Sequence, residues 1–272
     1  MNQLNLALKP LSSFKTFETA QLIELWCAEP VFFASRELSD TYYTEGTIGN
    51  YALAYALGWA RSPYRLTGKD TGQPKYIEDL TPLAEQCYIL PAWPLEGKTS
   101  FRFERFNGLS DSYWYAMTNN RVATAREDLP LMRSQTSKPS SFRASNFPQT
   151  GRLRVIERGN RFQTIVFSDR LLPEYIRVGK FMSKVRVDVI QSLPVMELPL
   201  GIHQCTAYLN VADIPADLEM LAFDLISMPP ASLLKNLQFR GTAWQIGNFT
   251  VPAQLSFCRG QYESSKNQTG TP

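Results

Sequence analysis

The sequence predicts one α+β domain of the ferredoxin-like (RRM-like) type that carries a long basic insertion. Three observations predict it: short stretches with strand-like alternation at both ends of the chain, a compact apolar helix after the first strands, and a strand-rich basic middle. The chain has 272 residues, of which 44% are hydrophobic, so it can bury a full core. We expect a single domain over residues 1–262 with an insertion at about 98–190.

The first elements are strands followed by a helix. Residues 14–35 are rich in β-branched and aromatic residues and are interrupted at Glu29-Pro30, which predicts two strands or one strand with a bulge, with Ile23, Leu25 and Cys27 on one face. Residues 47–58 (TIGNYALAYALG) predict a helix that Thr47 caps and Gly58 ends. Because apolar residues surround its axis, we expect it to be covered on more than one side.

The next segment alternates between connections and strands. Residues 61–86 contain several glycines and prolines and predict a long connection, and residues 87–90 predict a short buried strand. In residues 101–106 (FRFERF) aromatic and charged residues alternate, which predicts a half-buried strand with Arg102 on its solvent side.

The middle of the chain predicts a loop, a hairpin and a basic strand. Residues 133–150 are polar and basic, and we expect them to be mobile without a ligand. Residues 152–157 and 162–167 predict a hairpin around Gly159-Asn160. After Gly179 a strand is predicted in which Lys184, Arg186 and Asp188 face away from Val185, Val187 and Val189.

The C-terminal part predicts helix followed by strand. Pro215 precedes Leu218, Leu221, Ala222 and Leu225, whose spacing fits a helix that Met228-Pro229-Pro230 ends. A second helical run is predicted to end near Leu237, with strands near Ala243 and over 249–257. The polar tail, residues 263–272, is predicted to be disordered.

Several functional classes lack their sequence features. The longest nearly unbroken apolar stretch, residues 51–60, is about half of what a membrane span needs, and residues 1–10 do not resemble a signal peptide, so we expect a cytoplasmic protein. Four widely spaced cysteines contain no CxxC pair, and we interpret them as buried thiols. Nucleotide, hydrolase and metalloprotease motifs are absent, and with one histidine, His203, we expect no cofactor and no metal.

Charge is distributed unevenly along the chain. Residues 1–97 carry 7 basic and 11 acidic groups, residues 98–186 carry 17 and 7, and residues 187–272 carry 4 and 7. The middle part is therefore a polycation between two mildly acidic parts. This pattern predicts a polyanionic partner, with nucleic acid favoured over an anionic membrane because the cations do not fall on one face of an amphipathic helix.

The candidate RNA-binding residues follow from this charge. Single-stranded RNA is bound through phosphate contacts and through stacking of bases on aromatic rings, for which Phe142, Phe147 and Phe162 are the candidates. The alternative is that many of the arginines only solvate the surface or pair with Glu157 and Asp169. The cationic candidates are Arg121, Arg126, Arg143, Arg152, Arg154, Arg158, Arg161, Lys180, Lys184 and Arg186.

Three stretches resemble a known family. Residues 32–58 (FFASRELSDTYYTEGTIGNYALAYALG) resemble the N-terminal signature of the small handle-binding subunit of type I-D CRISPR effector complexes, a member of the RAMP superfamily. Residues 177–187 (RVGKFMSKVRV) resemble its basic strand, and Met228-Pro229-Pro230 with Leu233-Leu234 is similar to its C-terminal turn. The C-terminal part departs from many RAMP proteins, because it has only Gly241 and Gly247 where they carry a glycine-rich loop.

The resemblance implies a RAMP core with a basic β-hairpin thumb and a non-catalytic role. It implies that the chain binds the 5′ handle of the crRNA, contacts the large subunit and the first backbone subunit, and lies where it could touch target DNA near its flanking motif. It adds Arg36, Asn50 and Tyr51 to the RNA-binding candidates.

Two other functions compete with this one. One is a metal-independent endoribonuclease that processes CRISPR repeat RNA, with His203 as the base and a nearby Lys or Tyr stabilising the product charge. The other is a scaffold that only bridges other proteins, which would account for the apolar aromatic residues but not for the basic middle part.

Overall fold

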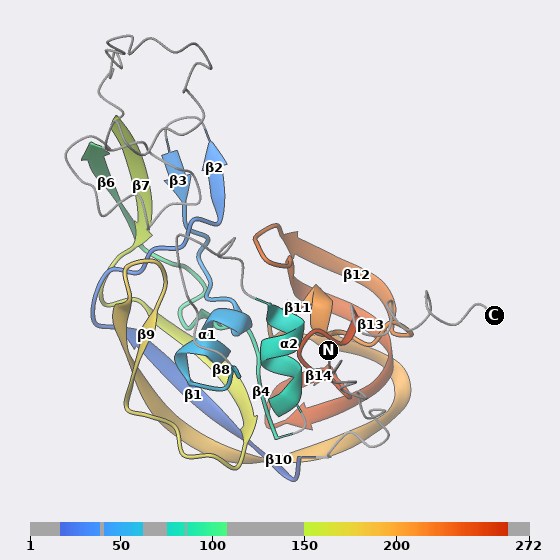
Figure 1. The fold of residues 1–272 in the computed structure, drawn as a ribbon. Helices are drawn as coiled ribbons and strands as arrows, with labels where there is room; N and C mark the ends of the chain where they lie inside the picture. The colour runs from blue at the N-terminus through green and yellow to red at the C-terminus, as the bar shows by residue number, and fades with distance from the viewer. Residues whose placement is uncertain (1–16, 39–40, 62–74, 85, 108–149, 261–272) are drawn as a thin grey trace, which may run out of the picture.

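The computed structural model describes residues 17–38, 41–61, 75–84, 86–107 and 150–260, which form two sheets and a few short helices (Figure 1). The larger sheet contains β1 (Thr19–Cys27), β4 (Cys87–Ile89), β5 (Trp93–Pro94), β8 (Arg161–Ser168), β9 (Tyr175–Val178), β10 (Ser183–Cys205), β11 (Leu209–Asn210), β12 (Glu219–Ile226), β13 (Leu233–Ile246) and β14 (Phe249–Pro252). The smaller sheet contains β2 (Arg36–Leu38), β3 (Thr41–Tyr43), β6 (Phe101–Asn107) and β7 (Thr150–Ile156). The helices are α1 (Asn50–Ala56) and α2 (Tyr76–Leu80), with 3₁₀ turns at Thr81–Leu83 and Val211–Asp213. The α+β class is confirmed, and antiparallel sheet dominates it.

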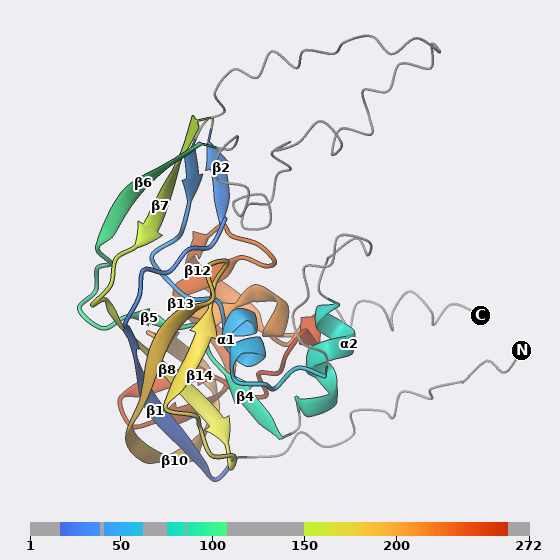
Figure 2. The same cartoon turned by 60° about the vertical axis from the view of Figure 1, so that its left-hand side comes forward.

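The larger sheet is organised around β1, which lies between β8 and β10 and is antiparallel to both. Ile23, Leu25 and Cys27 are fully buried on one face, as their alternation predicts. Both helices lie on the same side of this sheet (Figures 1 and 2). β10 is long enough to pair with β1 and β9 in its first half and with β13 in its second half.

Helix α1 is confirmed, but its predicted N-cap is wrong. Gly49 occupies the cap position without a side-chain bond, while the Thr47 hydroxyl donates to the carbonyl of Ala92 at 2.6 Å. The helix ends before Gly58, whose φ of +72° is the left-handed conformation that glycine adopts most easily. The prediction of an uninterrupted connection over residues 61–86 is wrong where α2 and the following 3₁₀ turn occur.

Strands β7 and β8 form where a hairpin is predicted, but they do not pair with each other. β7 lies between β3 and β6 in the smaller sheet, whereas β8 pairs with β1, β4 and β5 in the larger one. The chain crosses between the sheets at the predicted turn, where Gly159 has a φ of +86°. Alternation identifies a strand but not its partner, so the local pattern could not distinguish the two arrangements.

Both helices predicted near the C-terminus are strands. The segment that begins after Pro215 forms β12, and the run before Leu237 belongs to β13, which pairs with β10, β11, β12 and β14. The predicted strand near Ala243 is confirmed, and the strand predicted over 249–257 begins at Phe249 but ends at Pro252. The pairing energy along β13 overrides the helical spacing of Leu218, Leu221 and Leu225.

The smaller sheet projects from the larger body in both views (Figures 1 and 2). One of its faces is buried by a separate small core of Phe32, Ala34, Tyr42, Leu153 and Val155, against which Phe181 packs. The predicted insertion over residues 98–190 is therefore not one element, because β8, β9 and the start of β10 belong to the larger sheet. The predicted loop up to residue 149 and the tail from residue 261 lie outside the described residues.

Two expectations about composition are met where the structure can be read. All four cysteines are free and buried, and burial raises the pKa of Cys27, Cys205 and Cys258 to about 12. None of the helices in the described part of the chain is both long and apolar enough to cross a membrane.

Candidate nucleic-acid interface

The open face of the smaller sheet brings cations and aromatic rings together. Strand register places Arg36, Tyr43, Arg154 and Phe103 in one row across β2, β3, β7 and β6. A second row contains Arg152 opposite Arg105. Because the other face of the sheet is occupied by its small core, these side chains point to the solvent side.

Arg154 is the centre of this open face. Its guanidinium carbon lies 3.6 Å from the centroid of the Phe101 ring and 5.6 Å from that of Tyr43. The Tyr43 and Phe103 rings meet edge to face at 6.5 Å, and the Phe103 side chain is 60% exposed. A guanidinium held over a ring keeps its donors directed outward, so Arg154 can bind a phosphate while Phe103 presents a stacking surface.

The charges on this face are mostly not offset by acidic groups. Arg36 forms an ion pair with Glu45, which neutralises one cation at the edge. Within the described residues, no ion pair involves Arg105 or Arg154. The open face therefore keeps a net positive charge.

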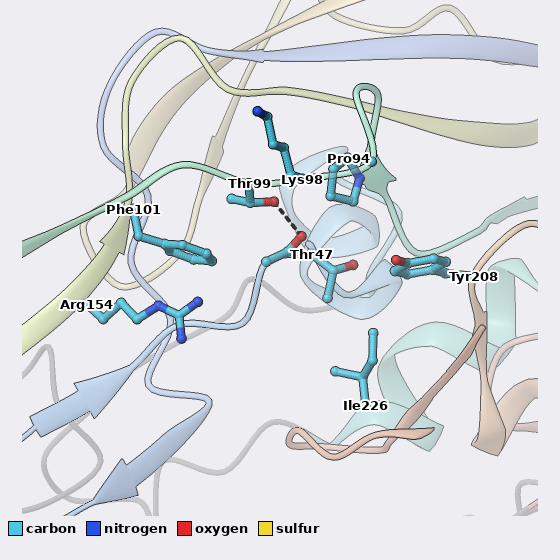
Figure 3. A pocket seen from close by; sticks show the side chains of 10 residues that line it. Thr47, Pro94, Lys98, Thr99, Phe101, Arg154, Tyr208 and Ile226 are labelled. Atoms are coloured by element: carbon cyan, nitrogen blue, oxygen red, sulfur yellow. Dashed lines mark hydrogen bonds between the residues drawn. The ribbon is translucent and has the colours of Figure 1, made fainter. Parts of the chain in front are cut away.

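A shallow pocket continues this face toward the larger sheet (Figure 3). Phe101 and Arg154 lie at one side of it, and Tyr208 and Ile226 lie at the opposite side. The Thr99 hydroxyl donates to the carbonyl of Gly46 at 2.9 Å, which joins two of the wall segments. With about 200 Å³ of space, it can accept a group of about the size of a nucleobase. Its lining residues are Gly46, Thr47, Pro94, Gly97, Lys98, Thr99, Phe101, Arg154, Tyr208 and Ile226.

Other predicted cations lie on a second face, on the larger sheet. Register places Arg161, Trp26, Arg186 and Tyr175 in one row across β8, β1, β10 and β9. Lys184 lies with its ammonium nitrogen 3.9 Å from the Tyr175 centroid, and Arg186 lies 5.1 Å from that of Trp26.

Acidic groups compensate this second face. Arg161 pairs with Glu24, Arg177 with Glu29 at 3.1 Å, and Arg186 with Asp188 at 2.8 Å. Each arginine is thus matched by one carboxylate. For these residues the ion pairs favour the alternative hypothesis, in which the arginines solvate the surface or pair with acidic groups rather than bind RNA. The predicted cluster of cations is therefore divided between the open face of the smaller sheet and this second face of the larger sheet, which differ in net charge.

The remaining predicted cations are separate from both faces or cannot be placed. Lys180 lies in the turn after Gly179, where burial lowers the pKa of its ammonium group, and Arg158 is exposed in the crossover between the sheets. Phe162 is fully buried, so its prediction as a stacking residue is wrong. Arg121, Arg126, Arg143, Phe142 and Phe147 lie outside the described residues.

Asn50 and Tyr51 lie in the interior rather than at a surface. The Asn50 amide donates to Asp213 Oδ2 at 2.6 Å, and the Tyr51 hydroxyl donates to Asp213 Oδ1 at 2.7 Å. The Tyr88 hydroxyl and the backbone amide of Cys258 also donate to this carboxylate. Burial raises the pKa of Asp213 to about 6, and the four hydrogen bonds oppose that rise. The network joins α1, β4 and the C-terminal segment, so we leave both residues out of the interface.

His203, the candidate base of the endoribonuclease hypothesis, makes structural contacts. Its Nε2 lies 3.0 Å from the carbonyl oxygen of Pro199, and its ring packs on Phe239 at 5.6 Å. It lies on β10, and no lysine or tyrosine contact with its ring is found among the described residues.

Sequence reasoning missed Tyr43, Phe101, Phe103, Arg105 and Lys98 as interface residues. The sequence signal for them lies in residues 101–106, where aromatic and charged residues alternate. There we expected the aromatic side chains to face inward. Phe103 and Arg105 are exposed on the open face instead. Arg102 is exposed as predicted, but on the opposite side, where it pairs with Glu104. Alternation gives the two faces of a strand but not which one is buried.

Comparison with known proteins identifies the family. A search of curated proteins found no match. A chain of the cryo-EM structure of the type III-B Cmr-beta bound to cognate target RNA and AMPPnP is similar at a TM-score of 0.39 and 10% identity, over 91% of this chain and 89% of that one. The model of the type I-D CRISPR-associated protein Cas5/Csc1 family matches residues 18–260. The chain therefore belongs to this Cas5/Csc1 family and is a subunit of a type I-D CRISPR effector complex.

Proposed function

We propose that this chain is a non-catalytic subunit that binds the 5′ handle of the crRNA on the open face of its smaller sheet. In the proposal it also contacts the large subunit and the first backbone subunit of the effector complex, and it lies where it could touch target DNA near its flanking motif. The handle is single-stranded in this proposal, so it offers both phosphates and unstacked bases.

The alternation of arginines and aromatic rings on the open face carries the proposal. Single-stranded RNA is bound by cations that follow its backbone and by rings on which its bases stack. Arg152 and Arg154 supply the first kind of contact and Tyr43 and Phe103 the second, on neighbouring strands. The pocket that adjoins Arg154 offers a place for one base beyond the open face.

The compensated face is the less favourable choice for RNA. Binding a phosphate to Arg161 or Arg186 would compete with Glu24 or Asp188, whose charges would repel the ligand. On the open face the described acidic neighbour is Glu45 at the sheet edge. We therefore assign Lys184 and Arg186 at most a secondary role.

The proposal also assigns the parts of the fold. We regard the larger sheet with α1 and α2 as the ferredoxin-like RAMP core, and β6 and β7 as part of the thumb. We propose that residues 1–262 act as a single domain. No step of RNA cleavage is assigned to any residue.

The test compares the two faces of the smaller sheet. In the assay, the purified chain binds a synthetic handle RNA over a range of salt concentrations. If Arg154 contacts a phosphate, Arg154→Ala should flatten the slope of log affinity against log salt by about 0.7. If a base stacks on Phe103, Phe103→Ala should weaken binding by about 1–3 kcal/mol.

Arg102→Ala is the matched control. It removes an equal charge from β6, the strand next to β7 that carries Arg154, but from the side that pairs with Glu104. We expect its salt slope to equal that of the wild type. Equal losses for Arg102→Ala and Arg154→Ala would show that the protein attracts RNA by overall charge, and the proposed face would then be wrong.

A further inference from the structure

The stretch from Val187 to Leu234 differs from the rest of the chain in its charge. It contains six acidic residues and no lysine or arginine. The segment itself supplies no cation to bind a phosphate, so it does not favour nucleic acid as a partner. The stretch nonetheless forms β12 and most of β10, which are long exposed strands.

The same stretch carries most of the exposed apolar side chains. Ten of the sixteen large hydrophobic residues that are exposed in the described part of the chain lie in it. They are Val189, Ile190, Met196, Leu200, Ile202, Val211, Met220, Leu221, Phe223 and Leu225. Exposed apolar residues are normal when scattered, but a concentration of this kind marks an interaction site.

Pairing with the same strand, β13, brings the exposed apolar residues of β12 and of the second half of β10 into one part of the sheet, which we call the acidic apolar surface. Ile202 on β10 is opposite Arg240 on β13, and Arg240 is opposite Glu219 on β12. Leu200 lies in the irregularity between Leu198 and Gly201, where the strand bulges, and is 74% exposed. The contact of His203 Nε2 with the carbonyl oxygen of Pro199 spans this bulge.

Two carboxylates at this surface have no ion-pair partner among the described residues. Glu197 on β10 and Asp217 before β12 are exposed, whereas Glu219 pairs with Arg240 and Asp224 with Lys235. An apolar strip with unpaired carboxylates is complementary to an apolar protein surface edged by lysine or arginine.

We infer that the acidic apolar surface is a docking site for another protein subunit, one that presents an apolar patch bordered by basic residues. The inference rests on the membership of the chain in an effector complex and does not require the RNA site proposed above. β12 pairs only with β13 among the described strands, and two register irregularities in β12 interrupt its edge. Such bulges hinder the addition of another strand, so the docking contacts are made by side chains.

The experiment assembles the type I-D complex from defined subunits with an affinity tag on a different subunit. The double variant Leu200→Ser/Ile202→Ser changes two exposed side chains. We expect roughly tenfold less of this variant to be incorporated, as for the loss of a central apolar contact. Glu197→Lys should also reduce incorporation, and raising the salt concentration should lessen its defect.

Leu171→Ser is the control, because Leu171 is 99% exposed but lies in the segment between β8 and β9. It should assemble as the wild type does. Handle-RNA binding by the isolated variants should stay unchanged, which separates this inference from the proposed RNA site. Normal incorporation of the double variant, loss of RNA binding in it, or wild-type self-association that it abolishes would overturn the inference.

Discussion

Replacement of Asp213 by asparagine should make the stability of the protein respond differently to pH. Burial raises the pKa of this carboxyl group from its ordinary value of about 4 to about 6. The folded state therefore takes up a proton at a higher pH than the unfolded state does. Protonation of Asp213 stabilises the fold as the pH falls through about 6, and the contribution is complete below about 4.

The magnitude follows from the size of that shift. Two pKa units at about 1.4 kcal/mol each give a total of about 3 kcal/mol, of which about 1.4 kcal/mol develops between pH 7.5 and pH 5. The free energy of unfolding is measured by urea denaturation of both proteins at the two pH values. Other ionisable groups are shared and cancel in the difference.

We expect the stability advantage of the wild type over Asp213→Asn to grow by about 1.4 kcal/mol when the pH is lowered from 7.5 to 5. The asparagine variant keeps the side-chain volume but cannot take up this proton. A difference that stays constant or shrinks on acidification would refute the assignment of a raised pKa to Asp213.

Three further predictions concern single features of the molecule. Gly179→Ala should lower the melting temperature, because φ is +73° and a Cβ there would lie 2.5 Å from the carbonyl oxygen of Phe32; Gly97→Ala, at φ +74° with no atom within 4 Å of the new Cβ, is the control and should cost clearly less. Changing Lys180, Lys184 and Arg186 together to alanine should leave the salt slope of RNA binding within error of the wild type, because Arg186 pairs with Asp188, Lys180 is partly buried and Lys184 is half-buried against the Tyr175 ring; a decrease of roughly 2 would restore the second face as a phosphate site. The protein incubated with repeat RNA and EDTA should show no cleavage, and His203→Ala should leave RNA binding unchanged, whereas specific cleavage that this substitution abolishes would support the endoribonuclease hypothesis.

The sequence predicted local elements better than it predicted their partners. Ile23, Leu25 and Cys27 could be placed in the core because alternation next to a buried helix has few other solutions. The pairing of β7 with β3 and β6 depends on residues more than a hundred positions away in the case of β3, and no local pattern encodes it. Leu218, Leu221 and Leu225 fit a helix equally well in isolation, and only the partner strand β13 decides against it.

The candidate site could be predicted in kind but not in position. The excess of cations in residues 98–186 correctly indicates where basic side chains are concentrated. Which of them keep an uncompensated charge depends on acidic residues from other parts of the sequence, as Glu24 shows for Arg161. In FRFERF we assigned the aromatic side chains to the buried face, because aromatic residues are usually buried. This assignment was wrong for Phe103, which is exposed.

The position of β1 in the centre of the larger sheet has a consequence for how the chain is made. β1 is synthesised well before its partners, which range from Arg161 on β8 to Pro194 on β10. Pairings so distant in sequence slow folding, because a long loop must close before any contact forms. At a synthesis rate of about 5–20 residues per second, the apolar face of β1 waits roughly ten seconds or more for a partner. A nascent chain stalled before β8 should therefore expose Ile23 and Leu25, and be prone to bind chaperones or to aggregate.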